Sequence, residues 1–156
     1  MIVTATDGHA FQDGPDHGRI LVSGADTEGV YSLMEWTVAA APPTAPLAYG
    51  PHLHGACEET FLIRSGCLDF LLGDVVTTLR PGDFVRVPPG TRHGYANTSG
   101  APVEMLVGFY PAGFEQLFLK YRTDQDPAPD PQGFITDAER LFGSRFETAI
   151  SPSDAE

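Results

Sequence analysis

Short strand-like runs fill the sequence between Arg19 and Phe109, and each run is broken by Gly, Pro or Asp. The runs are rich in β-branched, aromatic and aliphatic residues: RILVS, VYSLMEWTV, TFLIRSG, CLDFLLGD, VVTTLRPGD, FVRVPPGTR and VEMLVGFY. Such a series is typical of an antiparallel sandwich or barrel, and Gly73 with Asp74 predicts a tight hairpin between two of the strands. The stretch AAAPPTAPLAYGP, residues 39–51, includes four prolines and predicts a loop, because proline has no backbone N–H to give to a sheet.

After Pro111 the hydrophobic period changes from that of a strand to that of a helix. Apolar residues then recur at i, i+3, i+4 and i+7, at Phe114, Leu117, Phe118 and Tyr121. This stripe predicts an amphipathic helix that packs one face on the core, and we interpret it as packing rather than as a cofactor site.

A second helix is predicted in TDAERLFG, with Thr136 and Glu139 at capping-box spacing and a stop at Gly143. The stretch TDQDPAPDPQG before it predicts a proline-rich loop. The predicted organisation is an N-terminal segment (1–18), a β-barrel (19–110) and a C-terminal helical extension of the same domain (111–150).

Length and charge restrict the classes of partner. At 156 residues the chain can bury one core and is too short for two ordinary domains. Its net charge of −12 would repel phosphate backbones and anionic membranes, so we expect neither nucleic acid nor membrane as a partner. No apolar run approaches the roughly 20 residues of a membrane helix, and the N-terminus lacks the pattern of a signal peptide, which predicts a cytoplasmic protein.

The stretch HLHGACEETFLIRSG, residues 52–66, holds the residues that point to chemistry. His52 and His54 are two apart, so on a strand they project from the same face. Glu59 follows five residues later, and His93 lies on what should be another strand. Imidazole nitrogens with one carboxylate oxygen suit a divalent transition ion, so we predict one Fe, Mn, Ni, Co, Cu or Zn ion per chain.

The spacing of these residues resembles the two motifs of the cupin superfamily, in particular its small single-domain bacterial members. The matching positions are His52, His54, Glu59 and Gly66 in the first motif, and Gly82, Pro88, Gly90, His93 and Asn97 in the second. The resemblance implies an antiparallel cupin or jelly-roll barrel in which His52, His54, Glu59 and His93 hold the metal. The chain departs from the family at Pro46, where the first motif usually begins with a glycine that serves a turn.

Within that superfamily, HLHGACEETFLIRSG and the later PAGFEQLF resemble the quercetin 2,3-dioxygenase-like group. This resemblance implies a metal-dependent oxidoreductase, a dioxygenase acting on an enolic or phenolic small molecule, with Glu59 as the catalytic group that accepts the substrate's proton. Two alternatives stay open: a metal-dependent cyclase or isomerase of secondary metabolism such as aromatic polyketide pathways, and a non-catalytic cupin that binds a small molecule.

Aromatic and apolar residues near the motifs predict the substrate pocket. Phe61 and Ile63 share the face of Glu59 by strand alternation, and Tyr95 follows His93 by two residues. A homodimer is implied by the resemblance, with the aromatic stripe after Pro111 or the N-terminal strand as its contact.

Overall fold

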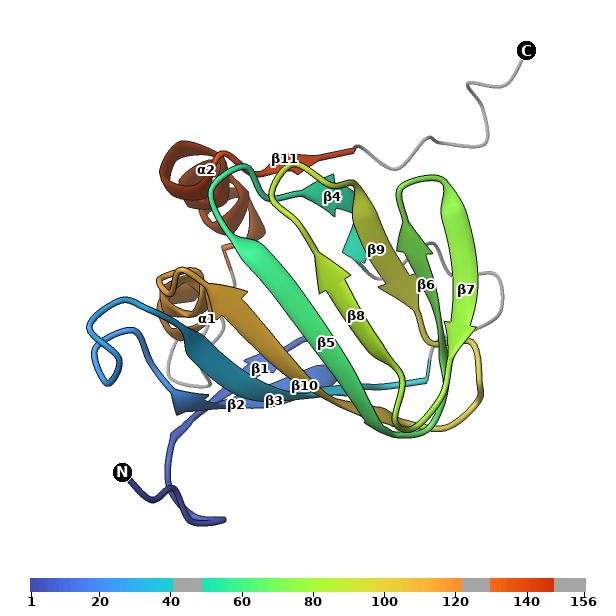
Figure 1. Cartoon of the computed structure of the whole chain (residues 1–156), viewed down its shortest axis with the longest axis horizontal. Helices are drawn as coiled ribbons and strands as arrows, with labels where there is room; N and C mark the ends of the chain where they lie inside the picture. Colours follow the sequence, from blue (N-terminus) through green and yellow to red (C-terminus); the bar gives the residue numbers. More distant parts are fainter. Residues whose placement is uncertain (41–48, 122–129, 148–156) are drawn as a thin grey trace.

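The computed structural model describes residues 1–40, 49–121 and 130–147. Within these residues the strands form two antiparallel sheets that curve around a common interior (Figure 1). One sheet has the order β1-β2-β3-β10-β5-β8, made of β1 (His9–Asp13), β2 (Asp16–Val22), β3 (Ser32–Val38), β10 (Val103–Tyr110), β5 (Glu58–Ser65) and β8 (Phe84–Val87). The other has the order β11-β4-β9-β6-β7, made of β11 (Arg145–Phe146), β4 (Tyr49–Leu53), β9 (His93–Ala96), β6 (Leu68–Leu72) and β7 (Val75–Leu79). The predicted all-β jelly-roll barrel is confirmed.

The central strands bury alternate side chains, which is what directs the site residues inward. On β3 the buried positions are Ser32, Met34, Trp36 and Val38. On β5, which pairs with both β10 and β8, the buried positions are Glu59, Phe61 and Ile63. One carboxylate is thus carried into the interior by a strand whose other inward side chains are apolar.

Two glycines stand at turns between strands. Gly73 and Asp74 join β6 to β7 with Leu72 opposite Val75, so the predicted hairpin is confirmed. Between β5 and β6, Gly66 has a φ of 76°, and a Cβ at this position would lie 2.7 Å from the carbonyl oxygen of Pro102. Only glycine satisfies both the dihedral angle and the close approach.

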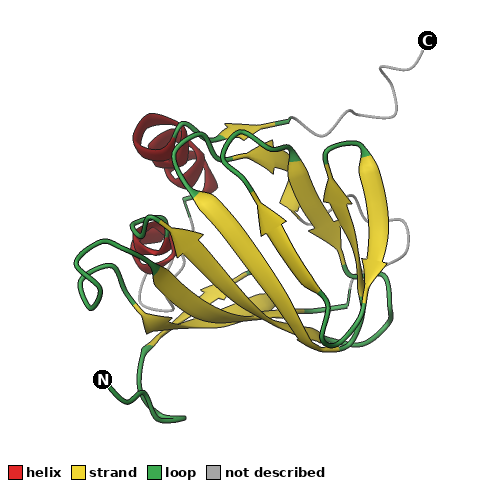
Figure 2. Cartoon of the chain, in the orientation of Figure 1, coloured by secondary structure: helices red, strands yellow, loops and turns green. Residues whose placement is uncertain are grey.

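Two helices, α1 (Glu115–Tyr121) and α2 (Pro131–Phe142), lie together on one side of the barrel (Figure 2). Phe114, Leu117 and Phe118 of the predicted stripe are buried, and Tyr121 is partly buried. The stripe therefore packs within the chain, and its buried side chains are not a contact surface for a second copy. Neither α1 nor α2 has the length and apolar character that crossing a membrane requires, and the described residues contain no other α-helix.

The predicted start of the second helix was wrong, although its end was right. The helix begins at Pro131, because the side chain of Asp130 caps it by accepting a hydrogen bond from the backbone N–H of Gly133 (2.7 Å). Thr136, expected at the cap, lies inside the helix. Gly143 ends it with a left-handed φ of 59°, as predicted. Residues 131–133 of the predicted loop are therefore helical, and residues 122–129 lie outside the described part of the chain.

Three strands lie wholly or partly where the sequence predicted none: β1, the start of β4, and β11, which lies within the predicted helical extension 111–150. β4 begins at Tyr49, inside the stretch predicted as a loop, while residues 41–48, including Pro46, lie outside the described residues. Its pairing with β9 is irregular between Tyr49 and His52, and such irregular pairing accommodates Pro51. β1 lies within the N-terminal segment 1–18 and pairs with β2 at the edge of its sheet.

Candidate metal centre

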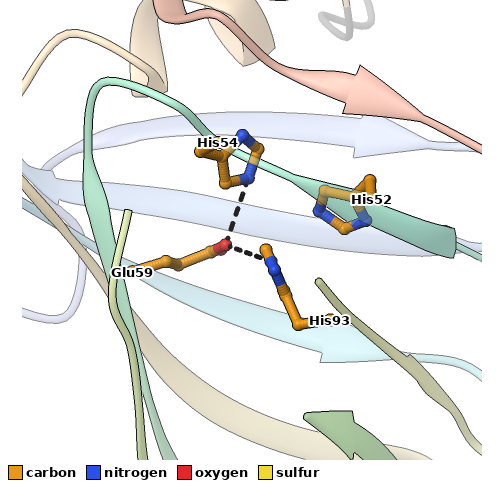
Figure 3. Close-up of side chains that lie close together, drawn as sticks. All are labelled: His52, His54, Glu59 and His93. Carbon is orange, nitrogen blue, oxygen red and sulfur yellow. Dashed lines mark hydrogen bonds and ion pairs between the residues drawn. The ribbon is translucent and has the colours of Figure 1, made fainter. Parts of the chain in front are cut away.

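Four side chains from three neighbouring segments meet in the barrel interior (Figure 3). His52 lies on β4, His54 follows directly after that strand, Glu59 lies on β5 and His93 begins β9. Because β4 pairs with β9, His52 and His93 are direct partners across the two strands. One donor atom from each of the four residues lies within 4.8 Å of all the others. We call these residues the His–Glu cluster.

The carboxylate of Glu59 lies between two imidazoles of the His–Glu cluster. Its Oε2 is 3.0 Å from Nε2 of His93 and 3.3 Å from Nε2 of His54, the two contacts marked in Figure 3. Glu59, His54 and His93 are all buried, and His52 is partly buried. The neighbouring Glu58 points the other way and forms an ion pair with Arg86 on β8, as strand alternation predicts.

The Nδ1 atom of each imidazole in the cluster lies within hydrogen-bond distance of an oxygen atom. Nδ1 of His52 lies 3.0 Å from the carbonyl oxygen of Gly50, and Nδ1 of His93 lies 3.0 Å from that of Thr91. Nδ1 of His54 lies 2.8 Å from the hydroxyl of Ser144. When Nδ1–H donates to an oxygen in this way, Nε2 carries the lone pair and can serve as a metal ligand. Three such nitrogens with one carboxylate fit a divalent transition ion.

The electrostatics of the His–Glu cluster also suit a cation. Burial alone would raise the pKa of the Glu59 carboxyl, but in the metal-free chain hydrogen bonds donated by Nε2–H of His54 and His93 outweigh burial and lower that pKa to about 2. A bound ion would take the place of those Nε2 protons. Burial, followed by the neighbouring His93 and His54, lowers the pKa of His52 to about 4, so this imidazole is neutral at neutral pH. An ionised carboxylate beside a neutral imidazole attracts positive charge.

A cavity of about 80 Å³ adjoins the His–Glu cluster. His52, His54 and Glu59 form part of its wall. The rest of the wall is Met34, Trp36, Gly50, Phe61, Tyr95, Val107, Phe114, Phe118, Phe134 and Phe146. Among these described lining residues, Glu59 is the only acidic one, and the surface is largely aromatic.

The structure places two of the three predicted pocket residues on this cavity. Phe61 and Tyr95 line it, whereas Ile63, one pleat further along β5, is packed in the core and is not among the lining residues. Burial and then the charge of Glu59 raise the pKa of the Tyr95 hydroxyl, which therefore stays protonated.

Sequence reasoning missed the contribution of the C-terminal extension to the cavity. Phe114, Phe118 and Phe134 belong to the helical region, and Phe146 belongs to β11. The sequence predicted packing alone for the first two, whereas they both pack and line the wall. The available signal was compositional, since five of the ten phenylalanines follow Pro111.

Comparison with known proteins agrees with this fold. Residues 37–109 match the family model of the cupin domain. The chain has the cupin fold. The matched region contains all four residues of the His–Glu cluster, and together with the structural neighbours it supports the cupin superfamily. No curated protein gives a significant sequence match to this chain.

Several solved structures are similar in fold to this chain. Pac13 of Streptomyces, described as a unique nucleoside dehydratase, shares 18% identity over 74% of this chain and 86% of its own, with a TM-score of 0.58. The polyketide cyclase RemF from Streptomyces resistomycificus shares 23% identity over 70% of this chain and 78% of its own, with a TM-score of 0.56. A predicted oxalate decarboxylase from Thermotoga maritima shares 18% identity over 71% of this chain and 99% of its own, with a TM-score of 0.60. At these identities the likeness extends to the fold alone.

Proposed function

We propose that this chain is a metal-dependent dioxygenase of the cupin superfamily that acts on an enolic or phenolic small molecule. One observation carries the proposal: three of the four residues of the His–Glu cluster line a cavity whose other walls are largely aromatic. A divalent ion held by His52, His54, Glu59 and His93 would supply Lewis acidity and open coordination positions for substrate and dioxygen. An aromatic enol or phenol would match the lining of this cavity in chemistry, because it offers one acidic hydroxyl and an otherwise apolar surface.

The side chains around the cavity have separate tasks in this proposal. Glu59, ionised at neutral pH and the only acidic group among the described lining residues, would accept the proton of the substrate hydroxyl at its carboxylate. Tyr95 keeps its hydroxyl proton and presents a neutral wall. Phe61 and Trp36, both buried, would contact the faces of an aromatic substrate and exclude water from the reacting atoms.

A second candidate function is a cyclase, isomerase or dehydratase that uses the same site without dioxygen. It is favoured by the likeness in fold to RemF, a polyketide cyclase, and to Pac13, a nucleoside dehydratase. In that reaction class Glu59 would move a proton between substrate atoms and no oxygen would be consumed.

The two functions are separated by turnover with and without oxygen. The purified chain would be loaded separately with Fe²⁺, Mn²⁺, Ni²⁺, Co²⁺, Cu²⁺ and Zn²⁺ and incubated with a flavonol, a catechol and a 1,3-diketone. Oxygen uptake and product mass would be followed together. Trp36, the single tryptophan of the chain, lines the cavity and reports binding through its fluorescence.

We expect consumption of one O₂ per substrate and both atoms of ¹⁸O₂ in the product. Conversion that proceeds equally well under argon would refute the dioxygenase and leave the second candidate. The compounds could instead quench the Trp36 fluorescence of the metal-loaded protein and yet not be converted in either atmosphere. A binding role without catalysis would then replace both candidate functions.

A further inference from the structure

The last described residues of the chain cross the segment that carries two of the proposed metal ligands. We call residues 142–147 the C-terminal strap. The carbonyl oxygen of Phe142 accepts hydrogen bonds from the backbone N–H groups of Gly55 and Ala56 (3.0 and 2.9 Å). Beyond it, β11 pairs with β4 and places Phe146 directly opposite His52, as Figure 1 shows for the two strands. The strap therefore holds residues 51–56 along their whole length.

The C-terminal strap is also tied to the strand that carries the third histidine. Nε and Nη2 of Arg92 contact the two carboxylate oxygens of Glu147 at 2.6 and 2.9 Å. Arg92 immediately precedes His93, the first residue of β9. The ring of Phe146 stacks on that of His52 with 5.5 Å between the ring centroids. One segment thus contacts the chain on both sides of the His–Glu cluster.

Ser144 is the strap residue that reaches a ligand directly. Its side chain is buried, and its Oγ lies 2.8 Å from Nδ1 of His54. The other two imidazoles rest on backbone carbonyls only two residues before them in the sequence. His54 therefore differs from them, because its Nδ1 contacts a side chain 90 residues away.

We propose that Ser144 is a positioning residue of the metal centre. Its hydroxyl oxygen accepts the hydrogen of Nδ1 of His54, which leaves the lone pair of that imidazole on Nε2 and directs it towards Glu59 and His93. The C-terminal strap supplies this hydroxyl, so the extension after the barrel completes the site rather than only covering it. This inference rests on the metal centre proposed above.

The test compares Ser144→Ala with Arg145→Ala on the full chain. The first variant removes only the hydroxyl, and the second alters the next residue of the strap, whose side chain is exposed. The probes are Co²⁺ and Zn²⁺, with dissociation constants measured by competition with a chromophoric chelator and the visible absorption of bound Co²⁺ recorded. Loss of an outer partner of a metal-ligating histidine typically weakens metal binding about 10- to 100-fold, which is the effect expected for Ser144→Ala.

Ser144→Thr separates positioning from packing, because it keeps the hydroxyl. We expect Arg145→Ala and Ser144→Thr to bind both ions within about threefold of the wild-type affinity, well below the roughly 10-fold loss that is the least expected for Ser144→Ala. The Co²⁺ spectrum should change only in Ser144→Ala. Ser144→Ala with wild-type affinity and spectrum overturns the proposal. If Ser144→Ala does not fold, Ser144→Thr decides: wild-type affinity and spectrum support the role, and weak binding by a folded Ser144→Thr overturns it. A wild-type chain that binds neither ion refutes the metal centre itself, a result distinct from these.

Discussion

Replacing Glu59 by Gln removes the charge of the His–Glu cluster while keeping nearly the same side-chain volume. The amide oxygen can still lie beside Nε2 of His93 and of His54, which are 3.0 and 3.3 Å from the carboxylate. Gln keeps an acceptor for these hydrogen bonds but loses the charge that strengthens them, so we expect the metal-free free energy of unfolding to fall by about 1–3 kcal/mol. Metal affinity should fall by about 100-fold or more. Mutating a residue that only hydrogen-bonds a metal ligand already weakens metal binding by up to about 100-fold, and Glu59 is itself a proposed ligand.

The size of the effect follows from binding linkage. With free Co²⁺ at 100 times the wild-type dissociation constant, binding stabilises the fold by about 2.7 kcal/mol. For a chain of 156 residues this raises the melting temperature by about 5 to 11 °C. A variant that binds 100-fold more weakly gains only about 0.4 kcal/mol, or about 1 °C.

The assay is thermal unfolding followed by circular dichroism, with Co²⁺ or with a chelator. Glu58→Gln is the matched control, because its side chain is the adjacent one on β5 and pairs with Arg86 away from the cluster. We expect the control to keep the full Co²⁺-dependent shift. If Glu59→Gln kept it too, the carboxylate would not be a ligand and the argument from geometry would fail.

Three further predictions concern the parts of the chain that support the site. In the Glu115 carboxyl, burial raises the pKa but hydrogen bonds from the backbone N–H groups of Gly24 and Gly113 outweigh it, so the pKa lies below the usual 4.5. A carboxyl whose pKa is lower in the folded state stabilises the fold fully at pH values above its unfolded-state pKa, and this stabilisation is lost as the pH falls through its folded-state pKa. Glu115→Gln should therefore lower the free energy of unfolding by about 1–3 kcal/mol at pH 7 and by less in acid, measured by urea unfolding at both pH values. A loss of stability that does not change with pH would contradict the assignment. Gly66→Ala should lower the free energy of unfolding by about 2 kcal/mol in the same assay, because its left-handed φ and close backbone neighbour exclude a Cβ, and an unchanged midpoint would count against this. Phe134→Ala should cost about 3 kcal/mol and weaken quenching of tryptophan fluorescence by aromatic ligands, whereas stability loss without weaker quenching would limit this residue to packing.

The sequence by itself determined the elements whose signals are local. Strand alternation placed Glu59 and Phe61 on one inward face, and the His-x-His spacing at His52 and His54 brought two imidazoles together. Gly73 and Asp74 marked a hairpin, because a positive φ is a property of one residue and its nearest neighbours. These features repeat every two residues or depend on a single backbone angle, so they can be recognised without knowing the partner strands.

Only the tertiary structure decided what surrounds the cluster. β1 and β4 form despite a polar or proline-rich sequence, because neighbouring strands offer them hydrogen bonds that local propensity does not reveal. The helical phenylalanines line the cavity beside the candidate ligands, which the period of their own helices could not indicate. Ser144 meets His54 across 90 residues because the chain folds back over β4 after α2. Such contacts arise where distant segments pack together, and the periodicity of a single segment carries no information about which other segment will cover it.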